Sequence, residues 1–250
     1  MSERGRQLVT PGTLVAKGRY KLEEGVFREG DEIYSSVIGL LDIRGSTIRV
    51  IPLEGPYIPK PGDRVIGVVT ETQFLGWMVR IRAPTPSILK ISEVPYKFDI
   101  LKGRLEDIFT VGDLLYAEVL SVNEVMQVKL TMMNPELRKL VGGRIFLVDP
   151  TRIPRVIGRR GSMVSLLKAN VCPEILIGQN GVIWTRCNDP EREELLGRIL
   201  RIIEREAHTS GLTNKIRSLI QEEIGLGETR KIGRRRKEVR RKRPRRTPTH

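Results

Sequence analysis

The sequence predicts a multidomain α+β protein with a small β domain, a five-stranded β-barrel, an α/β domain and a basic tail. Its 250 residues are enough for one to three small domains. Runs rich in valine and isoleucine, separated by glycine turns, fill the first half, whereas the longer helical patterns lie in the second half. We expect the four parts to occupy residues 1–59, 60–138, 139–225 and 226–250.

The first part, residues 1–59, is expected to form the N-terminal β domain. Two strand-like runs, IYSSVIGLLDI and STIRVIPLEG, are separated by Arg44-Gly45, which is a turn signal. This part contains no cluster of catalytic side chains. We therefore interpret it as a packing or docking module.

The second part, residues 60–138, is expected to form the barrel. PGDRVIGVVTETQ and GWMVRI form a first hairpin pattern, SILKISEV adds a strand, and VGDLLYAEVLSVN with MQVKLTM forms a second hairpin. Short strands in this order, with Gly-Asp at the entry to the first and fourth, are typical of a small closed barrel.

The barrel resembles the S1 variety of the OB fold. The motifs that carry the resemblance follow in the family's order: Gly62-Asp63, Gly76-Trp77, Lys90-Ile91-Ser92 and Gly112-Asp113. S1 barrels that bind RNA strongly carry aromatic residues where this chain has Leu75 and Met78. Phe74 or Trp77 could replace part of that aromatic platform, and a core position suits either residue equally well.

The resemblance implies an RNA-binding surface on the barrel. Because stacking aromatics are sparse, we expect a weak electrostatic surface made of Arg80, Arg82 and Lys90. A solvated basic face without an RNA partner explains the same residues equally well.

The third part, residues 139–225, alternates strand and helix patterns. A strand pattern, RIFLVD, precedes two short helical patterns, and EILIGQNGVIWTRC predicts a hairpin that turns at Asn180-Gly181. Asp189 and Pro190 mark the start of a longer helix. The last stretch, LTNKIRSLIQEEIG, has an apolar stripe that we interpret as packing.

VIGRRGSM, from Val156 to Met163, places a Gly-x-x-Gly loop between the two short helices, and this order of elements resembles a KH domain. Such a loop lets the backbone approach a phosphate, while arginines and the start of the next helix favour negative charge. A plain helix-turn-helix corner is the alternative. The residues we expect to bind RNA here are Arg155, Gly158, Arg159, Arg160 and Gly161.

The hairpin GQNGVIW resembles the Gly-x-Asn-Gly signature of exosome cap subunits, whose three-part order and VTPG start this chain shares. The resemblance implies that Gly178, Asn180 and Gly181 wedge the KH domain against the S1 barrel. It also implies a non-catalytic, archaeal RNA-binding subunit that guides RNA 3′ ends into a degradation chamber. Its partners would be RNA and a hexameric ring of RNase PH-like subunits. Three copies of this chain would form a cap on that ring, or copies of this chain would share the cap with another S1-type subunit.

The net charge of +14 lies mainly in the tail, residues 226–250, where twelve lysines and arginines face two acids. We expect this tail to be disordered. It would attract RNA without sequence preference, or it would only keep the protein soluble. The chain has no apolar run long enough to cross a membrane and no signal peptide, so we expect a cytoplasmic protein.

Other function classes have little support in the sequence. Cys172 and Cys187 are expected to be free, half-buried thiols, since a reducing cytoplasm disfavours disulfides and no zinc spacing is present. With two histidines and scattered carboxylates, we expect no catalytic site, metal or cofactor, which argues against a nuclease acting alone. An S1/KH transcription or translation factor is the competing binding protein, and co-purification would distinguish the two.

Overall fold

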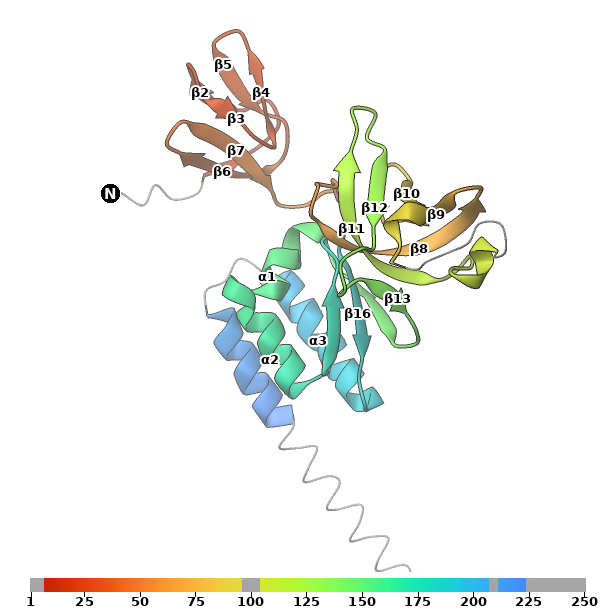
Figure 1. The fold of residues 1–250 in the computed structure, drawn as a ribbon. Helices are drawn as coiled ribbons and strands as arrows, with labels where there is room; N and C mark the ends of the chain where they lie inside the picture. Colours follow the sequence, from red (N-terminus) through yellow and green to blue (C-terminus); the bar gives the residue numbers. More distant parts are fainter. Residues whose placement is uncertain (1–6, 96–103, 207–210, 224–250) are drawn as a thin grey trace, which may run out of the picture. The chain divides into compact units, whose positions relative to one another are not determined.

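The computed structural model describes residues 7–95, 104–206 and 211–223 (Figure 1). The described chain divides into two compact units. The first unit comprises residues up to 154 together with 175–186, and the second comprises residues 155–174 and those from 187 onward. The predicted basic tail lies outside the described residues. Among the helices that are described, none is long and apolar enough to span a membrane.

The N-terminal domain is built from two small sheets. The first has the strand order β1 (Leu8–Val9), β6 (Gly39–Arg44), β7 (Thr47–Pro52) and β3 (Lys21–Leu22). The second has the order β2 (Leu14–Lys17), β5 (Glu32–Ser35) and β4 (Val26–Glu29). The β6–β7 hairpin turns after the Arg44–Thr47 pair, as the Arg44-Gly45 signal predicted. Its core includes Ile33, Ile48 and Val50, which are fully buried.

The barrel contains the five predicted strands, which are β8 (Arg64–Gln73), β9 (Gly76–Arg80), β10 (Ser87–Lys90), β11 (Leu114–Val122) and β12 (Val128–Thr131). Pairing of β12 with both β10 and β11 closes the sheet, and the predicted barrel is therefore confirmed. Two short 3-10 turns, Ile91–Glu93 and Leu105–Asp107, follow β10, and a strand that the sequence did not predict, β13 (Arg138–Leu140), pairs with β11.

The Gly-Asp motifs have a local structural reason. The Asp63 carboxylate accepts hydrogen bonds from the Tyr57 hydroxyl at 2.7 Å and from the Lys60 amide at 3.1 Å. Burial and the bond to this carboxylate raise the pKa of Tyr57. Asp113 accepts in the same way from the Thr110 amide at 2.8 Å, so each aspartate fixes the turn that leads into a barrel strand.

Two aromatic residues near the β8–β9 turn have opposite environments. Trp77 is fully buried, its indole N–H donates to the Phe109 carbonyl at 3.0 Å, and the two rings meet edge-on with centroids 5.0 Å apart. Phe74 is 88% exposed. Of these two residues, Trp77 thus belongs to the barrel core and Phe74 is accessible to a ligand.

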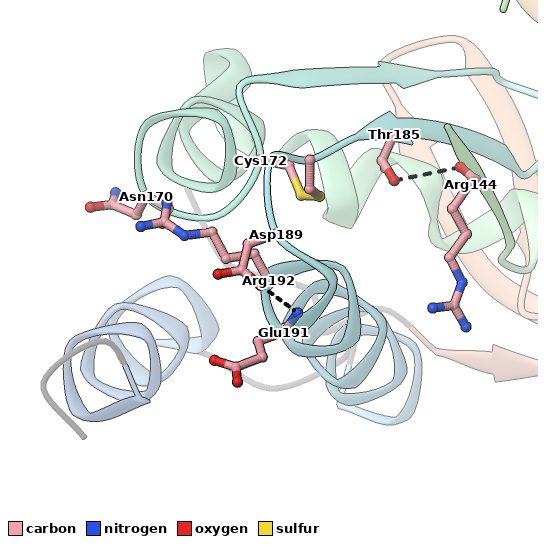
Figure 2. The surroundings of a disulfide bond; sticks show 8 residues. Arg144, Asn170, Cys172, Thr185, Asp189, Glu191 and Arg192 are labelled. Atoms are coloured by element: carbon pink, nitrogen blue, oxygen red, sulfur yellow. Dashed lines mark hydrogen bonds between the residues drawn. A yellow bond between two sulfur atoms is a disulfide. The ribbon is translucent and has the colours of Figure 1, made fainter. Parts of the chain in front are cut away.

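The C-terminal α/β region has a three-stranded sheet with the order β14 (Arg144–Leu147), β16 (Val182–Arg186) and β15 (Glu174–Ile177). Its helices are α1 (Ile153–Ile157), α2 (Ser162–Asn170), α3 (Pro190–Arg205) and a helix over residues 212–223, with 3-10 turns at Pro150–Arg152 and Arg159–Gly161. The predicted start of α3 is confirmed, because the Asp189 side chain accepts from the Glu191 amide at 3.1 Å (Figure 2). The apolar stripe of the last helix is buried at Leu212, Ile216 and Ile220.

Cys172 and Cys187 form a disulfide within the second unit, so the prediction of two free thiols was wrong (Figure 2). Cys172 lies just after α2 and is fully buried, and Cys187 lies two residues before the N-cap of α3. Their Cα atoms are 4.7 Å apart, which is within the range that a disulfide spans. The sequence rule failed because it infers the redox state from the compartment, whereas the pairing is set by distance in the fold.

Candidate nucleic-acid interface

The Gly-x-Asn-Gly hairpin between β15 and β16 docks on the first part of β8, which has no partner residues on β9. The fully buried Asn180 donates from Nδ2 to the Ile66 and Ile81 carbonyls, at 2.8 Å each, and its Oδ1 accepts from the Ile66 amide at 3.3 Å. The pairing of β8 with β9 begins only at Val68, so Ile66 has no strand partner on the β9 side. The amide side chain of Asn180 therefore takes the place of a neighbouring strand.

The two glycines of this hairpin are required by the close approach. A Cβ atom at Gly178 would overlap Asn180 Oδ1, and one at Gly181 would overlap the Val148 carbonyl oxygen. Gly181 also has a φ of +78°, which favours glycine. These three residues therefore act as a wedge within the first unit, by which we mean that they hold the β15–β16 hairpin against the barrel backbone at Ile66 and Ile81.

Arg82, which we expected to bind RNA, also contacts this wedge. Its Nη1 donates to the Gly181 carbonyl at 3.4 Å, and its backbone has a positive φ of 58°. The sequence gave no sign of this contact, because the two residues are 99 positions apart. Arg82 is exposed overall, so its charge still faces solvent.

The other two predicted barrel residues lie on the outer face of the sheet but at different ends. Lys90 pairs with Gly76 at the start of β9, and Arg80 is the last residue of β9. Four residues of strand separate them by roughly 13 Å. Lys90 and Arg80 therefore lie near opposite ends of β9 and do not form a single cluster.

Lys129 is an exposed basic residue that our sequence analysis missed. It lies on β12 beside Ile88 of β10, and its neighbours Val128 and Leu130 are fully buried. The alternation of buried and exposed positions in VKL is the signal that could have found it. With Lys90, it adds a second lysine to the outer face.

The Gly-x-x-Gly loop presents its arginines to solvent in the second unit. Gly158, Arg160 and Gly161 have positive φ values of 76°, 53° and 77°. A Cβ at Gly158 would lie 2.7 Å from the Met163 amide nitrogen, so this position requires glycine. Gly161 is the N-cap of α2 and offers no capping side chain, while Arg155, Arg159 and Arg160 are exposed. This arrangement can accept a phosphate.

A small hollow in the N-terminal domain is lined mainly by charged side chains. It is lined by Glu23, Asp42, Arg44, Thr47 and Arg49. Hydrogen bonds from Arg49, one of them 2.8 Å long, hold the pKa of Asp42 below its ordinary value. A carboxylate kept ionised by arginines cannot act as a general acid near neutral pH. Within the described ranges, no group of three or more His, Cys, Asp or Glu residues could hold a metal ion.

Comparison with known proteins places these features in a family. Residues 6–54 match the family model for the N-terminal domain of the exosome RNA-binding protein RRP4, and residues 57–142 match that for the S1 domain of the exosome complex component RRP40. The S1 resemblance is thereby confirmed. A crystal structure of an exosome complex RNA-binding protein covers 69% of this chain and 99% of its own, with 31% identity and a TM-score of 0.61.

Relatives from archaea match over most of the chain. The exosome complex component Rrp4 of Pyrococcus abyssi is 47% identical over 218 residues, which are 86% of this chain and 82% of the relative. The protein of the same name from Methanothermus fervidus is 47% identical over 215 residues, which are 86% and 95% of the two chains. The family expected from the sequence motifs is confirmed, and the chain belongs to the archaeal Rrp4 family of exosome complex components.

Proposed function

We propose that this chain is a non-catalytic RNA-binding subunit of an archaeal exosome. The observation that carries the proposal is the 47% identity, over 218 residues, to a relative named as an exosome complex component. The exposed basic residues of the barrel and of the Gly-x-x-Gly loop supply the positive charge that attracts a phosphate backbone. No feature of the described residues favours the alternative of a transcription or translation factor.

The proposal extends to the domains and their assembly. Residues 1–59 would dock on a hexameric ring of RNase PH-like subunits, the S1 barrel over 60–138 would receive RNA, and residues 139–225 would form a KH domain. Three copies, alone or mixed with another S1-type subunit, would cap the ring in the cytoplasm and guide 3′ ends into it. Three tethered copies raise the effective concentration of binding sites, so weak contacts suffice.

Co-purification tests this assembly. When the full chain is mixed with RNase PH-like ring subunits from the same organism, we expect both to elute together in gel filtration, with three chains per hexameric ring. The ring alone and the chain alone provide the two reference elution volumes. Separate elution, or recovery of the chain from cells with ribosomes or RNA polymerase in place of the ring, would contradict the proposal.

Neutralising the loop arginines should weaken RNA binding through electrostatics. Log affinity falls as log salt rises, and each lost phosphate contact makes this slope less steep by about 0.7 for a single strand. Arg159→Gln with Arg160→Gln should therefore make it less steep by about 1.4. Titration of a short single-stranded RNA at several salt concentrations measures this slope. The thermal midpoint should not change, because both side chains are exposed.

A matched control removes two charges elsewhere. Lys17 and Lys21 are exposed on strands of the N-terminal domain, so Lys17→Gln with Lys21→Gln lowers the net charge equally. We expect the control to keep the wild-type slope. If the loop variant also kept the wild-type slope and affinity, the loop would not lie on the RNA path.

A further inference from the structure

The two-residue turn between β8 and β9 is made of Phe74 and Leu75, which are 88% and 53% exposed. Turns of this length most often contain Asn-Gly or Asp-Gly, whose backbones suit the geometry. Leu75 is about half buried, but Phe74 contributes almost no burial and hence almost no hydrophobic stabilisation. Folding therefore does not explain why a phenyl ring stands in solvent at this position.

The backbone beneath Phe74 is held firmly by the neighbouring strand. Gln73 and Gly76 close the hairpin as a strand pair, and the Ile91 amide donates to the Leu75 carbonyl at 3.0 Å. Gly76 lies so close to β10 that a Cβ atom there would overlap the Leu89 carbonyl. The backbone that carries the ring is thus held in place before a ligand binds, which reduces the entropy lost on binding.

Two exposed lysines lie on the strands that adjoin this hairpin. Lys90 is exposed and is the direct strand partner of Gly76, two residues from Phe74. Lys129 is exposed on the next strand, beside Ile88. One acid, Glu71, is exposed on the same face, opposite Met78. An exposed aromatic ring in a turn, with exposed lysines on the adjoining strands, matches a ligand that has flat bases and a phosphate backbone.

We propose that Phe74 stacks on an unpaired base of single-stranded RNA while Lys90 contacts an adjacent phosphate. The inference rests on the proposed RNA-binding function and names the residue that selects single strands. Bases in a duplex are already stacked on each other, so the ring can act only on an unpaired base. The turn thereby supplies an aromatic contact that Leu75 and Met78 do not provide.

The test compares affinities of full-chain variants for a short single-stranded RNA without secondary structure. A stacking contact contributes about 1–3 kcal/mol, so Phe74→Ala should weaken binding by about 5-fold to 150-fold. The salt slope should stay the same, since the ring has no charge, and so should the thermal midpoint, since the ring is exposed. Lys90→Gln should instead make the salt slope less steep by about 0.7.

Four controls separate stacking from general apolar contact. Phe74→Trp should keep wild-type affinity or exceed it, whereas Phe74→Leu should lose as much affinity as Phe74→Ala. Leu75→Ala removes a neighbouring apolar side chain and should bind normally. Affinity for a blunt duplex of the same sequence should not depend on Phe74.

The outcomes distinguish this inference from the proposed function. Wild-type affinity of Phe74→Ala, or equal losses for Phe74→Trp and Phe74→Ala, would overturn the stacking role and leave RNA binding by the chain intact. If the wild-type chain itself bound no single-stranded RNA, both the proposed function and this inference would be overturned.

Discussion

Asn180→Ala is expected to lower the free energy of unfolding of the first unit by at least about 3 kcal/mol. The substitution leaves the Ile66 amide, the Ile66 carbonyl and the Ile81 carbonyl without their side-chain partner in a fully buried position. Each unsatisfied buried group costs about 1–3 kcal/mol. For a unit of this size, a 3 kcal/mol loss lowers the thermal midpoint by about 6–12 °C.

Tryptophan fluorescence during urea unfolding measures this loss. The chain has two tryptophans, Trp77 in the barrel core and Trp184 on β16, and both are buried in the first unit. Asn180→Asp should destabilise at least as much, because a carboxylate has no N–H group to donate to the two carbonyls.

Gln179→Ala is the matched control for the wedge. Gln179 precedes Asn180 in the same hairpin, but its bond to the Arg64 carbonyl, 2.7 Å long, comes from its backbone amide and survives the substitution. We expect a change within about 0.5 kcal/mol. If Asn180→Ala unfolded like the wild type but failed to bind RNA, Asn180 would be an RNA contact and not a wedge.

Features that depend on neighbouring residues could be predicted from the sequence. Asp189 with Pro190 predicts the start of α3, because an acceptor side chain and a fixed φ act within one helical turn. The strands of the barrel follow from runs of β-branched residues between glycine turns. β13 was missed because a strand of three residues is too short to show a pattern.

Features that depend on tertiary distance could not be predicted from local patterns. Asn180 reaches Ile66 and Ile81 across 114 and 99 positions, so only the family resemblance pointed to its role. Phe74 and Trp77 are both aromatic and three positions apart, and their environments differ because one lies in a turn and the other faces into the barrel. Nothing in their spacing distinguishes a ligand contact from a core residue.

The disulfide is a further case, and its removal has the second large expected effect. Cys172 and Cys187 are 15 positions apart, and a cross-link that closes such a loop contributes about 3 kcal/mol. Reduction should therefore lower the unfolding midpoint of the second unit. Circular dichroism follows the unfolding of this unit because the helices α2 and α3 lie in it. Tryptophan fluorescence follows the unfolding of the first unit, which holds both tryptophans.

Two measurements decide whether the link has this effect. Protein purified without reductant and then denatured should show no free thiol, and a reducing agent should shift the helical transition of the wild type. The double variant Cys172→Ser with Cys187→Ser should unfold at the lower midpoint and should not respond to the reducing agent. Because Cys172 is fully buried, part of the loss in that variant comes from burying a hydroxyl group, and the response to reductant isolates the cross-link. A wild type with two titratable thiols, or an unchanged midpoint on reduction, would show that packing alone holds these helices.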